Sequence, residues 1–173
     1  MNLIITCARH LESETKQEFS RILEMMGDSE SSIIITNMSG ILTAETRLEP
    51  SQVVNKIREM LSDEPWAIRY CLRIIPIQKI TETNIESIEK GILDLINLIS
   101  ENESYRISIE KRNSNISSQE IISRIAKKIK NKVSLEFPDK VVLIEILGNK
   151  TGIAIVKKTD ILSVEKTKRS LSE

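Results

Sequence analysis

The stretch YRISIEKRNSNISSQEIISRIAKKI, residues 105–129, decides the fold of the second half of the chain. Over 105–111 apolar and polar side chains alternate, which predicts a strand with one buried face. Ser117 and Glu120 have capping-box spacing, in which each side chain bonds the free backbone N–H of the other. The isoleucines that follow recur at helical spacing. A half-buried strand that leads into an amphipathic helix predicts a mixed α/β unit.

Residues before 78 show strand and helix patterns in the order β-α-β-β-α-β. The expected elements are a strand at 2–8, a helix from Leu11 to Gly27, strands at 32–38 and 41–47 around a Ser39-Gly40 turn, a helix from Pro50, and a strand at 66–77. This is the order of a ferredoxin-like sandwich, in which two helices cover one face of an antiparallel sheet.

A second set of elements is expected from Thr81 onward. Thr83 and Glu86 have capping-box spacing before an isoleucine-rich helix that runs to Ile99. Two strands are expected at 141–147 and 153–156, around a glycine-containing loop. The segment after Val164 is charged and serine-rich, so we expect it to be frayed or disordered.

Charge is divided unevenly along the chain, although the net charge is zero. Residues 1–64 hold 6 Lys and Arg against 11 Asp and Glu, whereas residues 65–173 hold 19 against 14. An acidic part joined to a basic part predicts two domains with different roles. A basic domain can attract phosphate within a neutral chain, because salt screens charges beyond about 8–10 Å.

The sequence lacks the common catalytic and cofactor motifs, such as glycine-rich phosphate loops, C-x-x-C and G-x-S-x-G. Its single histidine, His10, cannot build a zinc site alone. We therefore expect no enzyme activity, no metal and no cofactor. Cys7 and Cys71 each lie in an apolar segment and are predicted to be buried thiols. Without a signal peptide or a membrane span of roughly 20 apolar residues, a soluble, cytoplasmic protein is expected.

Basic side chains gather in the second half and are the candidate RNA contacts. They are Arg69, Arg73, Lys79, Lys111, Arg112, Asn113, Arg124, Lys127, Lys128, Lys130 and Lys132. Arg124, Lys127 and Lys128 share one helix face, and no acidic residue occurs within 121–132. A solvated helix face, or lysines that offset the helix dipole, would explain the same pattern.

The other candidates flank predicted strands. Lys111, Arg112 and Asn113 end the strand that begins at Tyr105; Arg112 could bind a phosphate through two N–H groups, and Asn113 could turn the chain. Arg69 and Arg73 are an even number of residues apart, so they could share a sheet face. The alternative is the exposed polar face of an ordinary sheet.

At these residues the chain resembles a THUMP domain preceded by its usual ferredoxin-like companion. The matching segments are LRIIP at 72–76, YRISIEKRN at 105–113, SQEII at 118–122, KVSLEFPD at 132–139 and VLIEI at 142–146. The family often has Asn-Pro-Asp where this chain has Phe137-Pro138-Asp139. The resemblance covers about residues 65–160.

The resemblance implies an α+β protein with an N-terminal ferredoxin-like domain at 1–64 and an α/β THUMP domain at 65–165. Residues 166–173 are left as a charged tail that we expect to be disordered. Most proteins of the family that the chain resembles are fused to an enzyme domain, and we expect none here because 173 residues leave no room for one. The chain most resembles the stand-alone subgroup that assists the RNA cytidine acetyltransferase in forming N4-acetylcytidine in tRNA.

This subgroup implies a tRNA-binding adaptor that contacts the acceptor stem and 3′ end, with the acetyltransferase as partner. Two alternatives remain at this point. The chain could be an RNA-binding subunit for another tRNA-modifying enzyme. It could instead be a ferredoxin-like protein–protein scaffold without RNA binding, which net neutrality and few aromatic residues favour.

Overall fold

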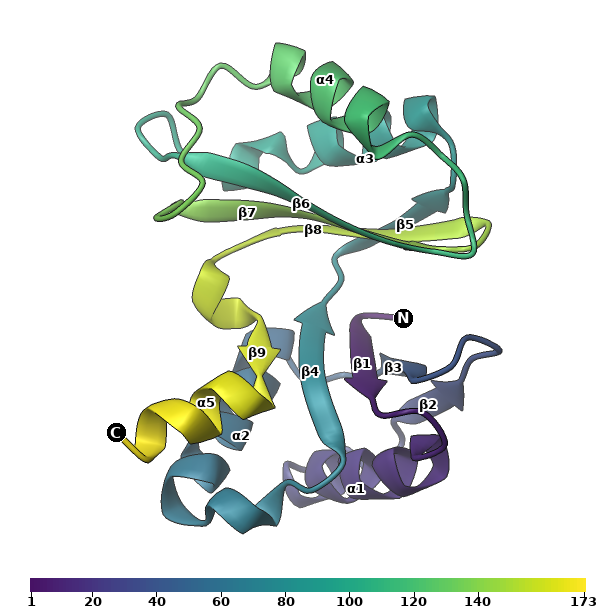
Figure 1. Ribbon diagram of the computed structural model, residues 1–173, viewed down its shortest axis with the longest axis vertical. Helices are drawn as coiled ribbons and strands as arrows, with labels where there is room; N and C mark the ends of the chain where they lie inside the picture. The colour runs from purple at the N-terminus through teal and green to yellow at the C-terminus, as the bar shows by residue number, and fades with distance from the viewer. The chain divides into compact units, whose positions relative to one another are not determined.

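The computed structural model describes residues 1–173 and divides the chain into two compact units, whose elements are labelled in Figure 1. The first unit comprises Met1–Pro76 and Thr159–Glu173, and the second comprises Ile77–Lys158. Both combine helices with a sheet, so the expected α+β class is confirmed. No helix has the length and apolar character needed to cross a membrane.

The first unit has a five-stranded antiparallel sheet in the order β2-β3-β1-β4-β9. Its elements are β1 (Leu3–Cys7), α1 (Glu12–Met25), β2 (Ser32–Ile35), β3 (Ile41–Glu45), α2 (Pro50–Asp63), η1 (Pro65–Ala67), β4 (Cys71–Pro76), β9 (Leu162–Ser163) and α5 (Val164–Leu171). From β1 to β4 this is the predicted ferredoxin-like order. Its core is formed by apolar side chains of α1 and α2 against one face of the sheet.

Two local features of the first unit follow from its sequence. Gly40, directly before β3, has φ +75°, and a Cβ there would lie 2.5 Å from the Cys7 carbonyl oxygen, so only glycine fits this turn. Cys7 and Cys71 face each other across β1 and β4, and both are buried free thiols, as predicted.

The carboxylate of Asp28 forms hydrogen bonds that hold the segment after α1 in place. Its side chain is 2% exposed. It accepts bonds from the Thr46 hydroxyl and from the backbone N–H groups of Arg47 and Glu30, at 3.1 Å each. The hydrogen bond from Thr46 is the main cause that holds the pKa of Asp28 below its usual value, and burial of the carboxylate opposes it in part.

We expect replacement of Asp28 by Asn to destabilise the protein in a pH-dependent way. The folded-state pKa lies below the unfolded value of about 3.9, so the carboxylate contributes stability above that pH. The contribution is lost as the pH falls through the folded-state pKa. The difference in unfolding free energy between wild type and Asp28→Asn, measured in urea, should therefore be constant near neutral pH and shrink below about pH 4. Asp63→Asn, at the exposed end of α2, is the control. A difference that does not vary with pH would contradict this role.

The second unit has a four-stranded sheet in the order β5-β8-β7-β6. Its elements are β5 (Lys79–Glu82), α3 (Ile85–Asp94), η2 (Ile96–Leu98), β6 (Tyr105–Arg112), α4 (Ser118–Lys128), β7 (Lys140–Leu147) and β8 (Lys150–Val156). Strands β6 and β7 are parallel, and the other pairs are antiparallel. Helices α3 and α4 cover the same face of this sheet, and isoleucines from both helices pack on it (Figure 1).

The two predicted capping boxes have different outcomes. Ser117 caps α4, since its hydroxyl accepts the Glu120 N–H at 3.2 Å, which is one of the two bonds of the predicted capping box. The prediction for Thr83 is wrong, since Asn84 caps α3 by accepting the Ser87 N–H at 2.8 Å. Strand β5, which the sequence analysis missed, keeps the chain extended up to Glu82, so the helix begins later than expected.

The unit boundaries also differ from the expected 64/65 and 165/166. Strand β4 pairs with β1 through four consecutive residue pairs, so the first unit extends to Pro76. The chain returns to this unit at Thr159, and β9 then pairs with β4. Residues 166–173, expected to be a disordered tail, lie mostly in α5. The hydroxyl of Ser163 caps this helix, and Lys168 Nζ donates to the Ile68 carbonyl at 2.7 Å.

Candidate nucleic-acid interface

The end of α4 and the residues after it carry a set of lysines without partners. Helix α4 turns Ile121 and Ile125 into the core, which leaves its opposite face to solvent. Lys127, Lys128, Lys130 and Lys132 are all exposed, and their ammonium groups make no ion pair or hydrogen bond. We call these four residues the lysine row. Clustered cations without carboxylates are the electrostatic feature that binds nucleic-acid phosphates.

Arg124 lies on the same helix but is already paired. Its Nε lies 2.7 Å from a carboxylate oxygen of Glu89 on α3, and this carboxylate raises the pKa of Arg124. The sequence could not show this pair, because the acid comes from 35 residues earlier in the chain. Arg124 is therefore less available to an RNA phosphate than the lysine row.

The candidates at the end of β6 mainly hold the fold. Lys111 Nζ donates to the Ile116 carbonyl at 2.8 Å. Arg112 Nη1 lies 3.1 Å from a carboxylate oxygen of Glu145, whose side chain is 1% exposed. Asn113 is exposed and has φ +54°, a left-handed conformation that agrees with the predicted turn.

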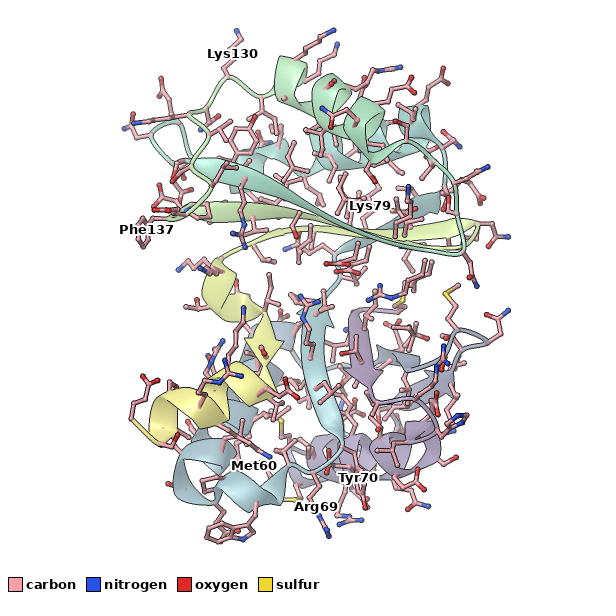
Figure 2. All side chains as sticks on the ribbon, in the orientation of Figure 1. Met60, Arg69, Tyr70, Lys79, Lys130 and Phe137 are labelled. Atoms are coloured by element: carbon pink, nitrogen blue, oxygen red, sulfur yellow. The ribbon has the colours of Figure 1, made fainter.

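The remaining candidates are dispersed. Lys79 forms an ion pair with Asp94. Arg69 and Arg73 belong to the first unit, where Arg73 lies in β4. Arg69 precedes that strand, with its guanidinium 5.9 Å from the centre of the Tyr70 ring, so the expectation of a shared sheet face is wrong (Figure 2).

The α4–β7 loop, residues 129–139, has an exposed apolar surface that was not predicted from the sequence. Leu135 is 73% exposed and Phe137 is 82% exposed. Figure 2 labels Phe137 at the surface of the second unit. The available signal was the set of apolar residues directly after the lysines, Val133, Leu135 and Phe137, which alternate with polar residues. Arg106 was also missed; its Nη1 donates to the Leu135 carbonyl at 3.1 Å.

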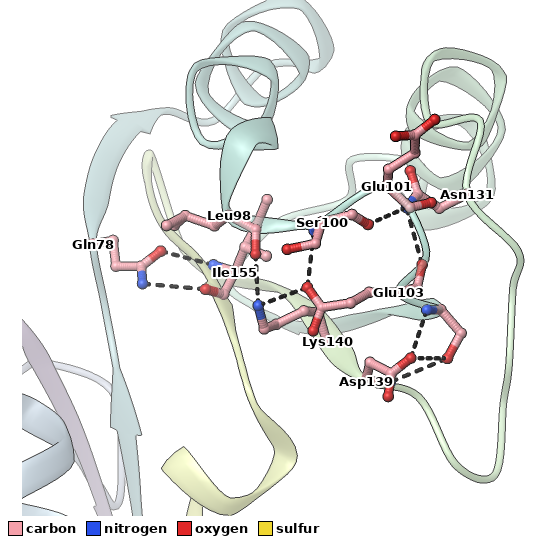
Figure 3. A network of polar contacts seen from close by, with 10 residues as sticks. Gln78, Leu98, Ser100, Glu101, Glu103, Asn131, Asp139, Lys140 and Ile155 are labelled. Carbon is pink, nitrogen blue, oxygen red and sulfur yellow. Dashed lines mark hydrogen bonds and ion pairs between the residues drawn. The ribbon is translucent and has the colours of Figure 1, made fainter.

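Side-chain bonds tie both ends of the α4–β7 loop to the chain before β6 (Figure 3). The Asn131 amide donates to the carbonyls of Ser100 and Glu103, at 2.8 and 2.9 Å. A carboxylate oxygen of Asp139 accepts the backbone N–H of Ser104 at 2.8 Å. The loop is thus held in one position although its apolar side chains face solvent.

These features define a two-unit α+β protein with an unpaired basic surface on its second unit. No group of three or more His, Cys, Asp and Glu side chains is placed to hold a metal ion. The sequence model of the THUMP domain matches residues 82–156. The second unit therefore contains a THUMP domain, as the resemblance implied.

Solved structures share the fold at low sequence identity. PH1313 from Pyrococcus horikoshii is 17% identical with a TM-score of 0.62, over 91% of this chain and 55% of its own. TrmN from Thermus thermophilus is 12% identical with a TM-score of 0.61, over 90% of this chain and 45% of its own. A 4-thiouridine synthetase–RNA complex with bound ATP is 13% identical with a TM-score of 0.51, over 91% and 42%. The chain spans about half the length of these proteins. Comparison with curated proteins found no match.

Proposed function

We propose that this protein binds tRNA through the THUMP-containing unit and presents it to a separate cytidine acetyltransferase that forms N4-acetylcytidine. The observation that carries RNA binding is the lysine row, four exposed cations without a carboxylate partner in a THUMP domain. Each ammonium group that neutralises a phosphate releases condensed counterions, which is the main source of sequence-independent affinity.

The other cations rank below the lysine row as contacts. Arg112, Arg124 and Lys79 each have a carboxylate partner, which an RNA phosphate would have to replace. Lys111 and Asn113 are exposed at the end of β6 and could add contacts. The interface would recognise the shape and backbone of the RNA, as proteins do on A-form helices, whose deep major groove is too narrow for side chains.

Similarity to other proteins supports tRNA as the ligand and a tRNA-modifying enzyme as the partner. A THUMP domain resembles modules of tRNA-modifying proteins, and one similar structure is a 4-thiouridine synthetase bound to RNA. The stand-alone subgroup that the chain resembles implies contact with the acceptor stem and 3′ end. An adaptor would act by raising the effective concentration of tRNA near the acetyltransferase and by orienting it.

Binding of the purified protein to total tRNA across a salt series tests the RNA-binding part. We expect a dissociation constant in the micromolar range or tighter, with affinity falling steeply as salt rises. Absence of binding even at low salt would overturn it. Mass spectrometry of tRNA from cells without this protein tests the adaptor part, where we expect loss of N4-acetylcytidine. Unchanged acetylation would instead favour another tRNA-modifying enzyme as the partner, which co-purification would identify.

One observation favours a second candidate function, a protein–protein scaffold. The first unit has a cleft of about 400 Å³ lined in part by Met25, Met60 and Tyr70, the last two labelled in Figure 2. Met25 is 66% exposed, and Trp66 of the same unit is 70% exposed. Methionine and aromatic side chains are enriched at protein interfaces. Binding of a protein partner without any RNA affinity would support this reading.

A further inference from the structure

The two phenylalanines of the chain have opposite environments. Phe19 is fully buried in the core of the first unit, whereas Phe137 in the α4–β7 loop is 82% exposed. Leaving an aromatic ring in water forgoes the favourable free energy that burial of such a side chain provides. The Phe137 ring therefore contributes little to the fold, and a role at the surface has to account for it.

The ring is presented from a backbone that is held on both sides. The Lys132 carbonyl accepts the Tyr105 N–H at 3.0 Å, and the Ser134 N–H donates to the Tyr105 carbonyl at 2.9 Å. Closer to the ring, the Phe137 N–H donates to Ser134 Oγ at 3.3 Å. The hydrogen bonds of the Asn131 and Asp139 side chains hold the same loop (Figure 3). The loop backbone therefore loses little conformational freedom when a ligand binds. Such pre-organisation raises affinity by lowering the entropy cost of association.

The charges near the ring select the kind of ligand. The lysine row precedes it in the chain, and the Arg106 guanidinium donates to the carbonyl of Leu135, two residues before the ring. Lys132 and Phe137 are five residues apart, which is at most roughly 18 Å of extended chain, or about five stacked nucleotides. A ligand that carries repeated negative charges and flat rings fits both features, and a single RNA strand has both.

We propose that Phe137 stacks on an unpaired base of the RNA whose phosphates the lysine row binds. This inference rests on the proposed function and adds that RNA with a single-stranded segment beside a helix is preferred. Aromatic rings accept any base, because every base has a π face.

Two RNA hairpins that differ only in an unpaired extension test the proposal. Affinities of the blunt and extended hairpins are measured by fluorescence anisotropy for wild type, Phe137→Ala and Phe137→Trp. Leu135→Ala is the matched control, since it removes a similarly exposed apolar side chain without a ring. A fluorescent base analogue in the extension reports stacking directly. Thermal unfolding of each variant checks that the fold is retained.

The extended hairpin should bind wild type more tightly than the blunt one. Phe137→Ala should weaken only the extended hairpin, by roughly 5- to 100-fold, with an unchanged salt slope because stacking releases no counterions. Phe137→Trp should retain the preference, and Leu135→Ala should change it little.

Three outcomes would overturn the stacking role. In one, wild type binds both hairpins equally; in another, Phe137→Ala keeps the preference. In the third, Leu135→Ala and Phe137→Ala weaken both hairpins alike, which indicates a general apolar contact of the kind that docks a protein. The first two leave RNA binding by the lysine row intact. Failure of wild type to bind either hairpin would overturn the proposed function itself.

Discussion

Replacement of all four residues of the lysine row by alanine should lower tRNA affinity on the order of a thousandfold at 0.1 M salt. Each phosphate contact contributes about 0.9 to the slope of log affinity against log salt concentration, so the slope should fall by roughly 3–4. The reduction should be similar for all tRNAs, because phosphate contacts carry no sequence information. Fluorescence anisotropy across a salt series measures both quantities.

A matched control comes from lysines of the same unit that already have partners. Lys79 and Lys150 form ion pairs with Asp94 and Glu82, so Lys79→Ala/Lys150→Ala removes positive charge but no unpaired cation. We expect each of these replacements to change the salt slope by less than a replacement in the lysine row. Equal slope changes per residue would mean that net charge alone, and not this surface, determines binding.

Replacement of Arg112 by alanine should lower the free energy of unfolding by about 2–3 kcal/mol. The guanidinium pairs with Glu145, which is 1% exposed, and removing one partner of a buried pair typically costs about 3–5 kcal/mol. The estimate is lower here because the Arg112 side chain is 25% exposed and water screens part of the interaction. Urea denaturation measures the change.

The exposed neighbour Lys111 is the control for this replacement. Lys111→Ala removes one bond to a backbone carbonyl and should cost less than about 1 kcal/mol. Arg112→Ala/Glu145→Gln should recover part of the stability, because the neutral amide is less costly to bury. If Arg112→Ala left stability unchanged and lowered the salt slope of tRNA binding by about one, Arg112 would be a phosphate contact and not a structural residue.

The elements that could be predicted are those whose pattern is local. The alternation at 105–111 lies within a single strand, and the capping spacing at Ser117 lies at the start of a single helix. The structure has β6 and α4 at these places. The four-residue strand β5 was missed because its pattern is too short to distinguish from a helix start. Strand β9, with two residues, is held only by pairing with β4, which residue spacing cannot reveal.

The sequence by itself determined the mixed α/β class, the THUMP-like segment and the clustering of lysines at 127–132, because periodicity and composition are local properties. Only the tertiary structure decided which cations remain free. Glu89 reaches Arg124 and Glu145 reaches Arg112 from distant parts of the chain, while no carboxylate reaches the lysine row. It also decided that Phe137 faces solvent, since bonds to Ser104 and Tyr105, which come from an earlier segment, hold the loop in place. Pairing and exposure depend on residues far apart in sequence, and folding alone brings them together.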